Sequence, residues 1–541
     1  MMKTAFTRTD SSNDVAISNV VQSTVKGPSA SEDRIHGAKP GLQSNTEMVL
    51  EEKASSASSQ TSGYRSFPEN LEVLCVLGAG DVNQGLRLAT ENRLRELGNR
   101  DYVNRIAVLP DVHWKPRMET PSSIAVESGS YVVPDATSVA LNDCMSVIRT
   151  QWHKDELEPQ WMEVFFRQLN RCAAPHRGAM TPYSPSVEDL ASFLFEGAAA
   201  AVRRYGMPDH WLDSIENQGQ SAFHHVSSRD LHRIVPWLMR TCRVFRSEFG
   251  LNYRGNHFVE VQYVSDIVDP ELAKQWQIFP GQVVIMSHLG PGPFTGNLLH
   301  LYSKRQKQSS LRRILRAGWK MPWHLGRRSD AKRAERWQAF VNPQRFQGFC
   351  LDSAIGNELA CAIHFGTNCG FAYQVASHRA LLDAMDHSAK ERSMSRPEPE
   401  LLWCVSHNHI TRETVTQDPV VIARHNAARA YEGQPTVIAG SYDVPSCLGV
   451  GMDGGSRLLR SYDHGFGALI DQSTHASHRS TGFEKALIYY MKRDQHGTLK
   501  RIVHRPKRPC KEIVDQALQV LESERITRRV CHMEPLATMH N

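Results

Sequence analysis

The chain has 541 residues, of which 40% are hydrophobic and 22% charged, and this balance is typical of a globular protein with a sizeable core. No run approaches the roughly 18 uninterrupted apolar residues that a membrane-spanning helix needs, so we expect no transmembrane segment. Lys and Arg exceed Asp and Glu by 6, which gives a pI near 8.7 and only hints at a polyanionic partner.

Cysteine usage and the N-terminal residues bear on the compartment. The 11 cysteines are scattered without a C-x-x-C pair, so we expect free thiols in a reducing environment. The N-terminal residues include Asp10 and Asp14 and lack the apolar segment of a signal peptide, so we do not expect secretion. Lys3 and Arg8 among Ser and Thr leave a mitochondrial presequence open, whereas the acidic residues favour a cytoplasmic or nuclear location.

The chain begins with a polar region and continues with strand-like and helical patterns. Residues 1–66 are rich in Ser, Thr and Gly, which predicts a disordered tail because too little apolar surface can be buried to offset the entropy of ordering. Apolar runs predict strands at 71–77, 105–110, 130–134, 138–150, 257–264, 282–289, 401–407 and 436–440. A helical period predicts helices at 158–173, 189–206, 228–245 and 512–524.

These patterns follow one another without an internal repeat or a long linker. The interleaving of strands and helices predicts the α/β class, as one large mixed domain over residues 67–541 built as a layered sandwich. Several polar residues stand at the ends of predicted strands, where rigid elements can hold a site. We therefore expect the functional groups to be collected there.

A basic segment covers residues 304–336. It holds 12 Lys and Arg residues against two acidic ones, so its positive surplus exceeds that of the whole chain. Trp319, Trp323 and Trp337 lie in or beside it, a combination suited to neutralising a nucleic-acid backbone and stacking on bases. A solvated basic helix face has the same composition, and the residues alone leave the two interpretations equal.

Three histidines each stand beside a predicted strand: His257 in GNHFVEVQ, His288 in VVIMSHLG and His407 in WCVSHN. One such histidine is more often a hydrogen-bonded structural residue than a ligand, but the recurrence favours a shared site. Together with the Cys144 thiol they would form a set of nitrogen and sulfur ligands suited to Mn, Fe, Co or Zn.

Two further segments are rich in glycine. In SYDHGFGAL, His464 precedes two glycines that would let the backbone approach a ligand, and a neutral imidazole can attack an activated phosphate. In QPTVIAGSYDVPSC, Ser441 and Ser446 could offer hydroxyl groups to a phosphate or a base. Each segment on its own is also compatible with an ordinary turn.

Taken in order, these motifs resemble the RtcB family of RNA splicing ligases over residues 70–541. The segment GNHFVEVQ is the most specific match, because it is close to the family's G-N-H-F-x-E-x-Q. The other matching segments are PDVHW, DCMSVIRT, MSHLG, VSHN, ARAYEGQPTVIAGS, HGFG and EPLATMHN, which follow in the family's order.

The resemblance implies a role for each of these residues. It makes Cys144, His257, His288 and His407 ligands of one or two Mn²⁺ ions and His464 the histidine that becomes guanylylated. The positions matching the family's guanine-nucleotide site are Asn256, Glu260, Asn408, Ser441, Ser446 and His540.

The implied activity is the joining of RNA ends. GTP would be attacked by His464, GMP would pass to an RNA 3'-phosphate, and a 5'-hydroxyl would displace it. The ends joined would be a 3'-phosphate or 2',3'-cyclic phosphate and a 5'-hydroxyl, as in tRNA splicing or RNA repair. RNA is the implied partner, with activating or complex subunits left open.

Several positions depart from the family's pattern. Leu141 replaces the metal-binding Asp, which leaves Asp143 as the nearest carboxylate, and Cys404 replaces an acidic residue near His407. His425, Ala468 and His540 stand where the family has basic groups. The alternative is therefore a degenerate RtcB-like pseudoenzyme that acts as an RNA-binding or scaffold subunit. A carboxylate from Asp143 or another residue in the Leu141 position would favour the enzyme, whereas only aliphatic groups there would favour the pseudoenzyme.

Overall fold

The computed structural model describes residues 84–540 with single-residue and short gaps and with longer ones at 251–255, within 301–343, and at 471–486, 493–498 and 505–510. By internal contacts the chain divides into two units, Met1–Ser59 and Gln60–Asn541, and the described residues lie in the second. The predicted tail at 1–66, the predicted strand at 71–77 and almost all of the basic segment at 304–336 lie outside the described residues.

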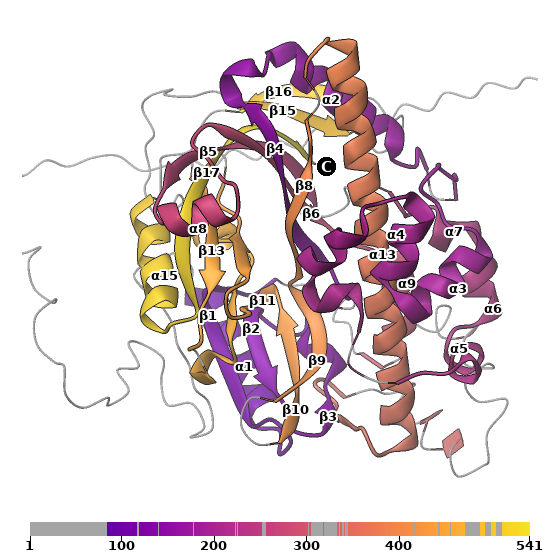
Figure 1. Cartoon of the computed structure of the whole chain (residues 1–541). Coiled ribbons are helices and arrows are strands. Elements are labelled where there is room, and N and C mark those ends of the chain that lie inside the picture. Colours follow the sequence, from indigo (N-terminus) through magenta and orange to yellow (C-terminus); the bar gives the residue numbers. More distant parts are fainter. Residues whose placement is uncertain are drawn as a thin grey trace, which may run out of the picture. The chain divides into compact units, whose positions relative to one another are not determined.

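A nine-stranded sheet organises the domain (Figure 1). Its main path runs β12-β13-β17-β5-β6-β4-β8, and β15 pairs with β17 and β16. All these pairs are antiparallel except β15 with β17. The strands are β4 (Cys144–His153), β5 (Phe258–Ile267), β6 (Gln282–Leu289), β8 (Glu400–Ser406), β12 (Pro435–Ile438), β13 (Ser446–Gly451), β15 (Leu487–Lys492), β16 (Leu499–His504) and β17 (Thr527–His540).

Smaller sheets complete the strand structure. A four-stranded antiparallel sheet has the order β1-β2-β10-β9, and two ladders join β11 with β14 and β3 with β7. Their strands are β1 (Arg105–His113), β2 (Ser122–Glu127), β3 (Tyr131–Val132), β7 (Phe349–Cys350), β9 (Asn408–Thr414), β10 (Pro419–His425), β11 (Ala427–Arg429) and β14 (Ser461–Asp463).

The long helix α13 (Ala354–Glu391) packs against α2, α3, α4 and α9 (Figure 1). Its N-terminus is capped by Ser353, whose hydroxyl accepts a hydrogen bond from the Gly356 amide at 3.0 Å. Most of its 38 residues are buried, and its apolar residues share one core with β4 and with α2, α3, α4 and α9. The remaining helices are α1 (Gln84–Gly98), α2 (Pro159–Cys172), α3 (Val187–Glu196), α4 (Ala198–Tyr205), α5 (Ser228–Ile234), α6 (Trp237–Thr241), α7 (Arg243–Arg246), α8 (Pro270–Gln275), α9 (Pro293–Leu299) and α15 (Lys511–Ser523).

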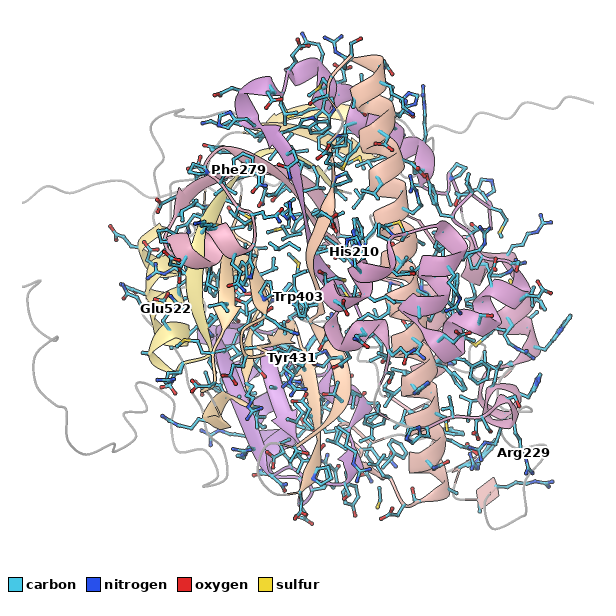
Figure 2. All side chains as sticks on the ribbon, in the orientation of Figure 1. His210, Arg229, Phe279, Trp403, Tyr431 and Glu522 are labelled. Carbon is cyan, nitrogen blue, oxygen red and sulfur yellow. The ribbon has the colours of Figure 1, made fainter. Side chains whose placement is uncertain are left out.

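The alternation of side chains along β4 separates two apolar cores. Cys144 and Ile148 belong to the core that contains α13, whereas Met145 and Val147 belong to a second core on the opposite face. This second core includes Trp403 and the apolar face of α15 (Figure 2). The face of the sheet to which a side chain of β4 points therefore decides in which of the two cores it is buried.

The predicted mixed α/β fold is confirmed. The helices expected at 158–173 and 512–524 correspond to α2 and α15, and the strand expected at 282–289 is β6. The expected helix at 189–206 is two helices that meet at Gly197, and the one at 228–245 is three short helices, with Pro236 preceding the second. No helix in the described part of the chain is long and apolar enough to cross a membrane.

Candidate metal and nucleotide site

The histidines singled out in the sequence lie at the ends of neighbouring strands. His257 directly precedes β5, His288 lies near the end of β6, and His407 stands between β8 and β9. Phe258 pairs with His288 across β5 and β6. In the sheet β4 lies between β6 and β8, with β5 on the far side of β6. Residues from segments far apart in sequence therefore meet at one end of these strands.

Four imidazoles form a contiguous group. The His288 ring centroid lies 5.3 Å from that of His257, 4.7 Å from that of His407 and 5.4 Å from that of His464. The rings of His407 and His464 stack at 4.4 Å with 12° between their planes. One nitrogen each from His288, His407 and His464 lie within 4.8 Å of one another, so these three can act as ligands of one metal ion.

Burial keeps the His288 and His407 imidazoles neutral. It lowers the pKa of His288 and of His407 well below the ordinary value, and the neighbouring histidines lower both further. The Nε2 atoms of His288 and His407 approach to 3.0 Å. Two neutral nitrogens that converge in this way either share one proton or direct their lone pairs to a common cation. The Nδ1 atom of His407 has no hydrogen-bond partner among the described residues.

His464 follows β14, and its own hydrogen bond fixes its tautomer. Its Nδ1 lies 3.0 Å from the backbone oxygen of Asn426. A carbonyl oxygen can only accept, so Nδ1 carries the proton and Nε2 keeps its lone pair. Burial, followed by the charge of Lys115, lowers the pKa of His464 to about 3. The imidazole is therefore an uncharged base with an available nitrogen at neutral pH.

A short series of hydrogen bonds connects Asp143 with His464. The Asp143 carboxylate Oδ2 lies 3.8 Å from His257 Nε2 and accepts from Asn408 Nδ2 at 3.4 Å. The Asn408 side-chain oxygen accepts the Asn426 amide at 3.0 Å, and Asn426 in turn accepts from His464. Two of the predicted residues, Asn408 and His464, are thus coupled through a residue that the sequence did not single out.

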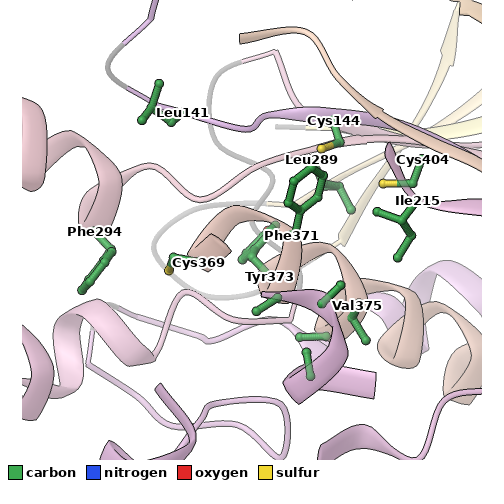
Figure 3. Packing of buried hydrophobic residues seen from close by; sticks show 14 of the residues in the cluster. Leu141, Cys144, Ile215, Leu289, Phe294, Cys369, Phe371, Tyr373, Val375 and Cys404 are labelled. Atoms are coloured by element: carbon green, nitrogen blue, oxygen red, sulfur yellow. The ribbon is translucent and has the colours of Figure 1, made fainter. Parts of the chain in front are cut away.

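The Cys144 thiol makes a local hydrogen bond. Its sulfur donates to the Asn142 carbonyl oxygen at 3.4 Å and is not among the three-ligand group found in the described residues. Burial, followed by a hydrogen bond with Cys404, raises the pKa of the Cys144 thiol well above its ordinary value. Both cysteines belong to the apolar core that contains α13 (Figure 3). A role of Cys144 as metal ligand stays a prediction.

Glu260 and Ser446, both predicted to face the nucleotide, are linked through Gln262. The Gln262 side-chain amide donates to Glu260 Oε2 at 2.6 Å and to Ser446 Oγ at 3.0 Å. Ser446 Oγ also accepts the Gly440 amide at 3.1 Å. Burial raises the pKa of Glu260 to about 7. This group provides a buried carboxylate on β5 and a hydroxyl on β13, the two strands that flank β17.

The other predicted nucleotide residues lie around these two groups. Asn256 is exposed, and its backbone hydrogen-bonds His288. Ser441 closes a turn in which its amide donates to the Val444 carbonyl oxygen at 2.9 Å. His540 pairs with Phe258 at the end of β17, and its side chain lies outside the described residues.

Sequence reasoning missed a buried acidic pair and a lysine at the site. The amide of Asp111 donates to Asp463 Oδ1 at 3.1 Å, and burial raises the pKa of Asp463 to about 7. The positive charge of Lys115 contributes to the lowered pKa values of His288 and His464. The motif PDVHW contains Asp111 and directly precedes Lys115, so it was the available signal for both residues.

Comparison with known proteins identifies the family that carries this arrangement. A sequence model described as tRNA-splicing ligase RtcB matches residues 95–541. The chain belongs to the RtcB family. The RtcB protein of Thermococcus kodakarensis is 23% identical over 456 residues, which cover 79% of this chain and 86% of the relative. That of Aeropyrum pernix is 24% identical over 438 residues, covering 76% and 82%. That of Pyrococcus horikoshii is 24% identical over 436 residues, covering 74% of this chain and 44% of the relative. All three are named tRNA-splicing ligases.

The donor set of this RtcB-family chain fits a divalent cation. Neutral imidazole nitrogens are ordinary ligands of Mn²⁺ and Zn²⁺, and the lowered pKa values of His288 and His407 mean that no proton has to leave before binding. A buried carboxylate oxygen, Asp143 Oδ1, has no hydrogen-bond partner in the described part of the chain. A cation would be a ligand-binding partner for the imidazole nitrogens and would also give Asp143 Oδ1 a partner.

Proposed function

We propose that this protein is an RNA ligase of the RtcB type that joins RNA 3'-phosphate or 2',3'-cyclic phosphate ends to 5'-hydroxyl ends through guanylylated His464. The geometry of His464 carries the proposal. Its neutral ring holds a proton on Nδ1, leaves Nε2 available as a nucleophile, and lies beside two imidazoles able to hold a cation.

The first chemical step would be attack of His464 Nε2 on the α-phosphorus of GTP. A nitrogen–phosphorus bond forms while the bond from that phosphorus to the bridging oxygen of pyrophosphate breaks, and pyrophosphate leaves with the electron pair. The Asn426 carbonyl oxygen holds the Nδ1 proton throughout and stabilises the positive charge that develops on the ring. A 2',3'-cyclic phosphate end would first be opened by water to a 3'-phosphate. The guanylyl group then passes from His464 to the RNA 3'-phosphate, and the 5'-hydroxyl of the second RNA end displaces GMP.

His288 and His407 would hold a divalent metal ion, with His257 and Cys144 as the further ligands expected from the sequence. Mn²⁺ in this position would supply positive charge to neutralise phosphate oxygens during in-line displacement.

Guanine recognition would fall to the group around Glu260. Its carboxylate is buried and can accept hydrogen bonds from the donors on the guanine edge, while Ser446 offers a hydroxyl group. A pKa of about 7 leaves the ionised form accessible near neutral pH, and donors from a bound base would favour it further.

Lys115 supports the enzyme interpretation over the pseudoenzyme. Basic positions of the family are occupied by His425, Ala468 and His540, yet the Lys115 charge acts on His288 and His464. A cation beside the nucleophile could stabilise the charge of a bound triphosphate. The pseudoenzyme alternative is supported by Leu141, which is buried in the apolar core and offers no ligand atom.

A ligation assay tests the proposal. Purified protein is incubated with Mn²⁺, GTP and two RNA strands, one ending in a 3'-phosphate and the other beginning with a 5'-hydroxyl. A joined product that requires GTP and both end groups is expected. RNA binding without any joined product, in a folded sample, would support the RNA-binding pseudoenzyme instead.

A further inference from the structure

We propose that Asp143 is a metal-ligating carboxylate of this chain, which supplies the charge that Leu141 cannot. The inference rests on the proposed function, since it concerns the metal of the same site. Asp143 stands two residues after the position at which the sequence pattern expects a metal-binding Asp.

The backbone fixes Asp143 beside the histidine ligands. The His407 amide donates to the Asp143 carbonyl oxygen at 3.0 Å, and the Asn142 amide donates to the Asn408 carbonyl oxygen at 2.7 Å. The segment that bears Asp143 is therefore bound directly to the segment that bears His407. A shift of the Asp143 backbone relative to His407 would require these backbone hydrogen bonds to break.

The carboxylate is buried and only half satisfied. Its Oδ2 contacts His257 and Asn408, whereas Oδ1 has no hydrogen-bond partner among the described residues. Burying an anion without full compensation destabilises the folded state by on the order of several kcal/mol, unless a cation or a proton binds to it. The unsatisfied oxygen is therefore available to bind a cation.

The separation of the two donors suits a shared ion. Ligand atoms of Mn²⁺ or Zn²⁺ lie about 2.1 Å from the metal, so two of them lie roughly 3 to 4 Å apart. The 3.8 Å between Asp143 Oδ2 and His257 Nε2 falls within that range. Gly290 leaves room for the Asp143 carboxylate, because a Cβ atom at this position would lie 1.7 Å from Asp143 Oδ1.

Leu141 and Asp143 are directed to different surroundings by the residue between them. Asn142 adopts a left-handed conformation with φ of 65°, which turns the chain at this point. Leu141 is fully buried in the apolar core and lies close to Gly366, where an added Cβ would be 3.1 Å from its Cδ1. A carboxylate at 141 would be buried in the apolar core, whereas the carboxylate at 143 lies beside His257.

Direct Mn²⁺ binding tests this assignment. Metal-free wild type, Asp143→Asn and a control are titrated with Mn²⁺ alone, and bound ions are counted by electron paramagnetic resonance and calorimetry. The control is Asp135→Asn, a buried carboxylate that accepts the Phe346 amide at 3.1 Å. We expect Asp143→Asn to lose one ion or to bind Mn²⁺ about 100-fold or more weakly, beyond the usual effect of residues that only orient ligands. A smaller loss would overturn the assignment.

Thermal unfolding of the same variants separates a ligand from a structural residue. Without metal, Asp143→Asn should unfold at the same or a higher temperature than wild type, because an uncompensated charge has been removed. With Mn²⁺, the increase in unfolding temperature should be much smaller than in wild type. A large loss of stability without metal, combined with an unchanged response to Mn²⁺, would contradict the assignment.

The outcome is independent of ligase activity. If Asp143→Asn loses Mn²⁺ while wild type shows no guanylylation, the ligand assignment stands and the proposed function fails. If wild type is guanylylated and Asp143→Asn binds Mn²⁺ as well as wild type does, the assignment alone fails.

Discussion

Asp463 and His464 are consecutive residues whose pKa values are shifted in opposite directions by burial. It lowers the pKa of the imidazole to about 3 and raises that of the carboxyl to about 7, and in both cases the uncharged form is favoured. The sequence predicted His464 from HGFG, but its burial and its bond to Asn426 depend on strands that are distant in sequence. A single motif could not reveal its protonation state.

We expect Asp463→Asn to stabilise the protein above pH 7. Because the pKa of Asp463 is raised to about 7 in the folded state, the folded protein binds one more proton than the unfolded chain between about pH 4 and pH 7, and stability falls across that window as pH rises. The loss amounts to about 1.4 kcal/mol for each unit of pKa difference. Asparagine retains the acceptor for the Asp111 amide, so the variant should show a higher free energy of unfolding at pH 8 and a flatter pH dependence.

Urea denaturation at pH 5.5 and pH 8 measures both quantities. The exposed Asp453 provides the control, because its partner Arg525 lowers its pKa and it does not titrate in this range. An Asp463→Asn variant that is less stable than wild type at pH 8 would contradict the account.

At the level of the elements, a local pattern predicted single helices where the structure has several. Residues 189–206 keep a helical period throughout, but Gly197 has φ of 58° and ψ of −129° and separates α3 from α4. The break is imposed by a distant contact, because a Cβ at Gly197 would lie 2.1 Å from the Gly219 carbonyl oxygen. The sequence also missed α13, because a helix buried on nearly all sides has no polar stripe to give a period.

Two glycines offer a matched test of that break. Gly206 also has positive φ, at 61°, but an added Cβ meets nothing within 4 Å. We expect Gly206→Ala to lower the free energy of unfolding by about 1 kcal/mol, the cost of a left-handed alanine. Gly197→Ala should lower it by about 3 kcal/mol or more, because strain and a backbone clash add. Equal losses in chemical denaturation would contradict the role assigned to the Gly219 contact.

For the whole molecule, the site is assembled from segments spread between Asp111 and His464. The interleaving of strand and helix patterns was sufficient to predict the mixed α/β fold, and the recurrence of histidines beside predicted strands marked His257, His288 and His407. Which ring contacts which was not predictable, because it depends on the strand order β5-β6-β4-β8. The sequence named Asp143 only as the carboxylate nearest to Leu141 and did not single out Lys115, because the charges that act on the imidazoles depend on how the chain folds.

Metal binding at this shared site should stabilise the entire domain. We expect Mn²⁺ to raise the unfolding temperature of wild type, because an ion bound only by the folded state shifts the equilibrium toward it. His407→Ala should abolish most of this increase. His210→Ala provides the control, because this exposed histidine pairs with Glu400 at 2.9 Å, outside the imidazole group. A full response to Mn²⁺ in His407→Ala would contradict the site.

The most direct measurement of the central claim is covalent labelling with GTP carrying a radioactive α-phosphate. Wild type and His464→Ala are incubated with Mn²⁺ and labelled GTP, denatured and separated, and His225→Ala, at an exposed histidine, is carried as a control. The account predicts an acid-labile label on wild type and the control and none on His464→Ala. A label that persists in His464→Ala, or no label on folded, metal-bound wild type, would contradict the assignment of His464 as the guanylylated nucleophile.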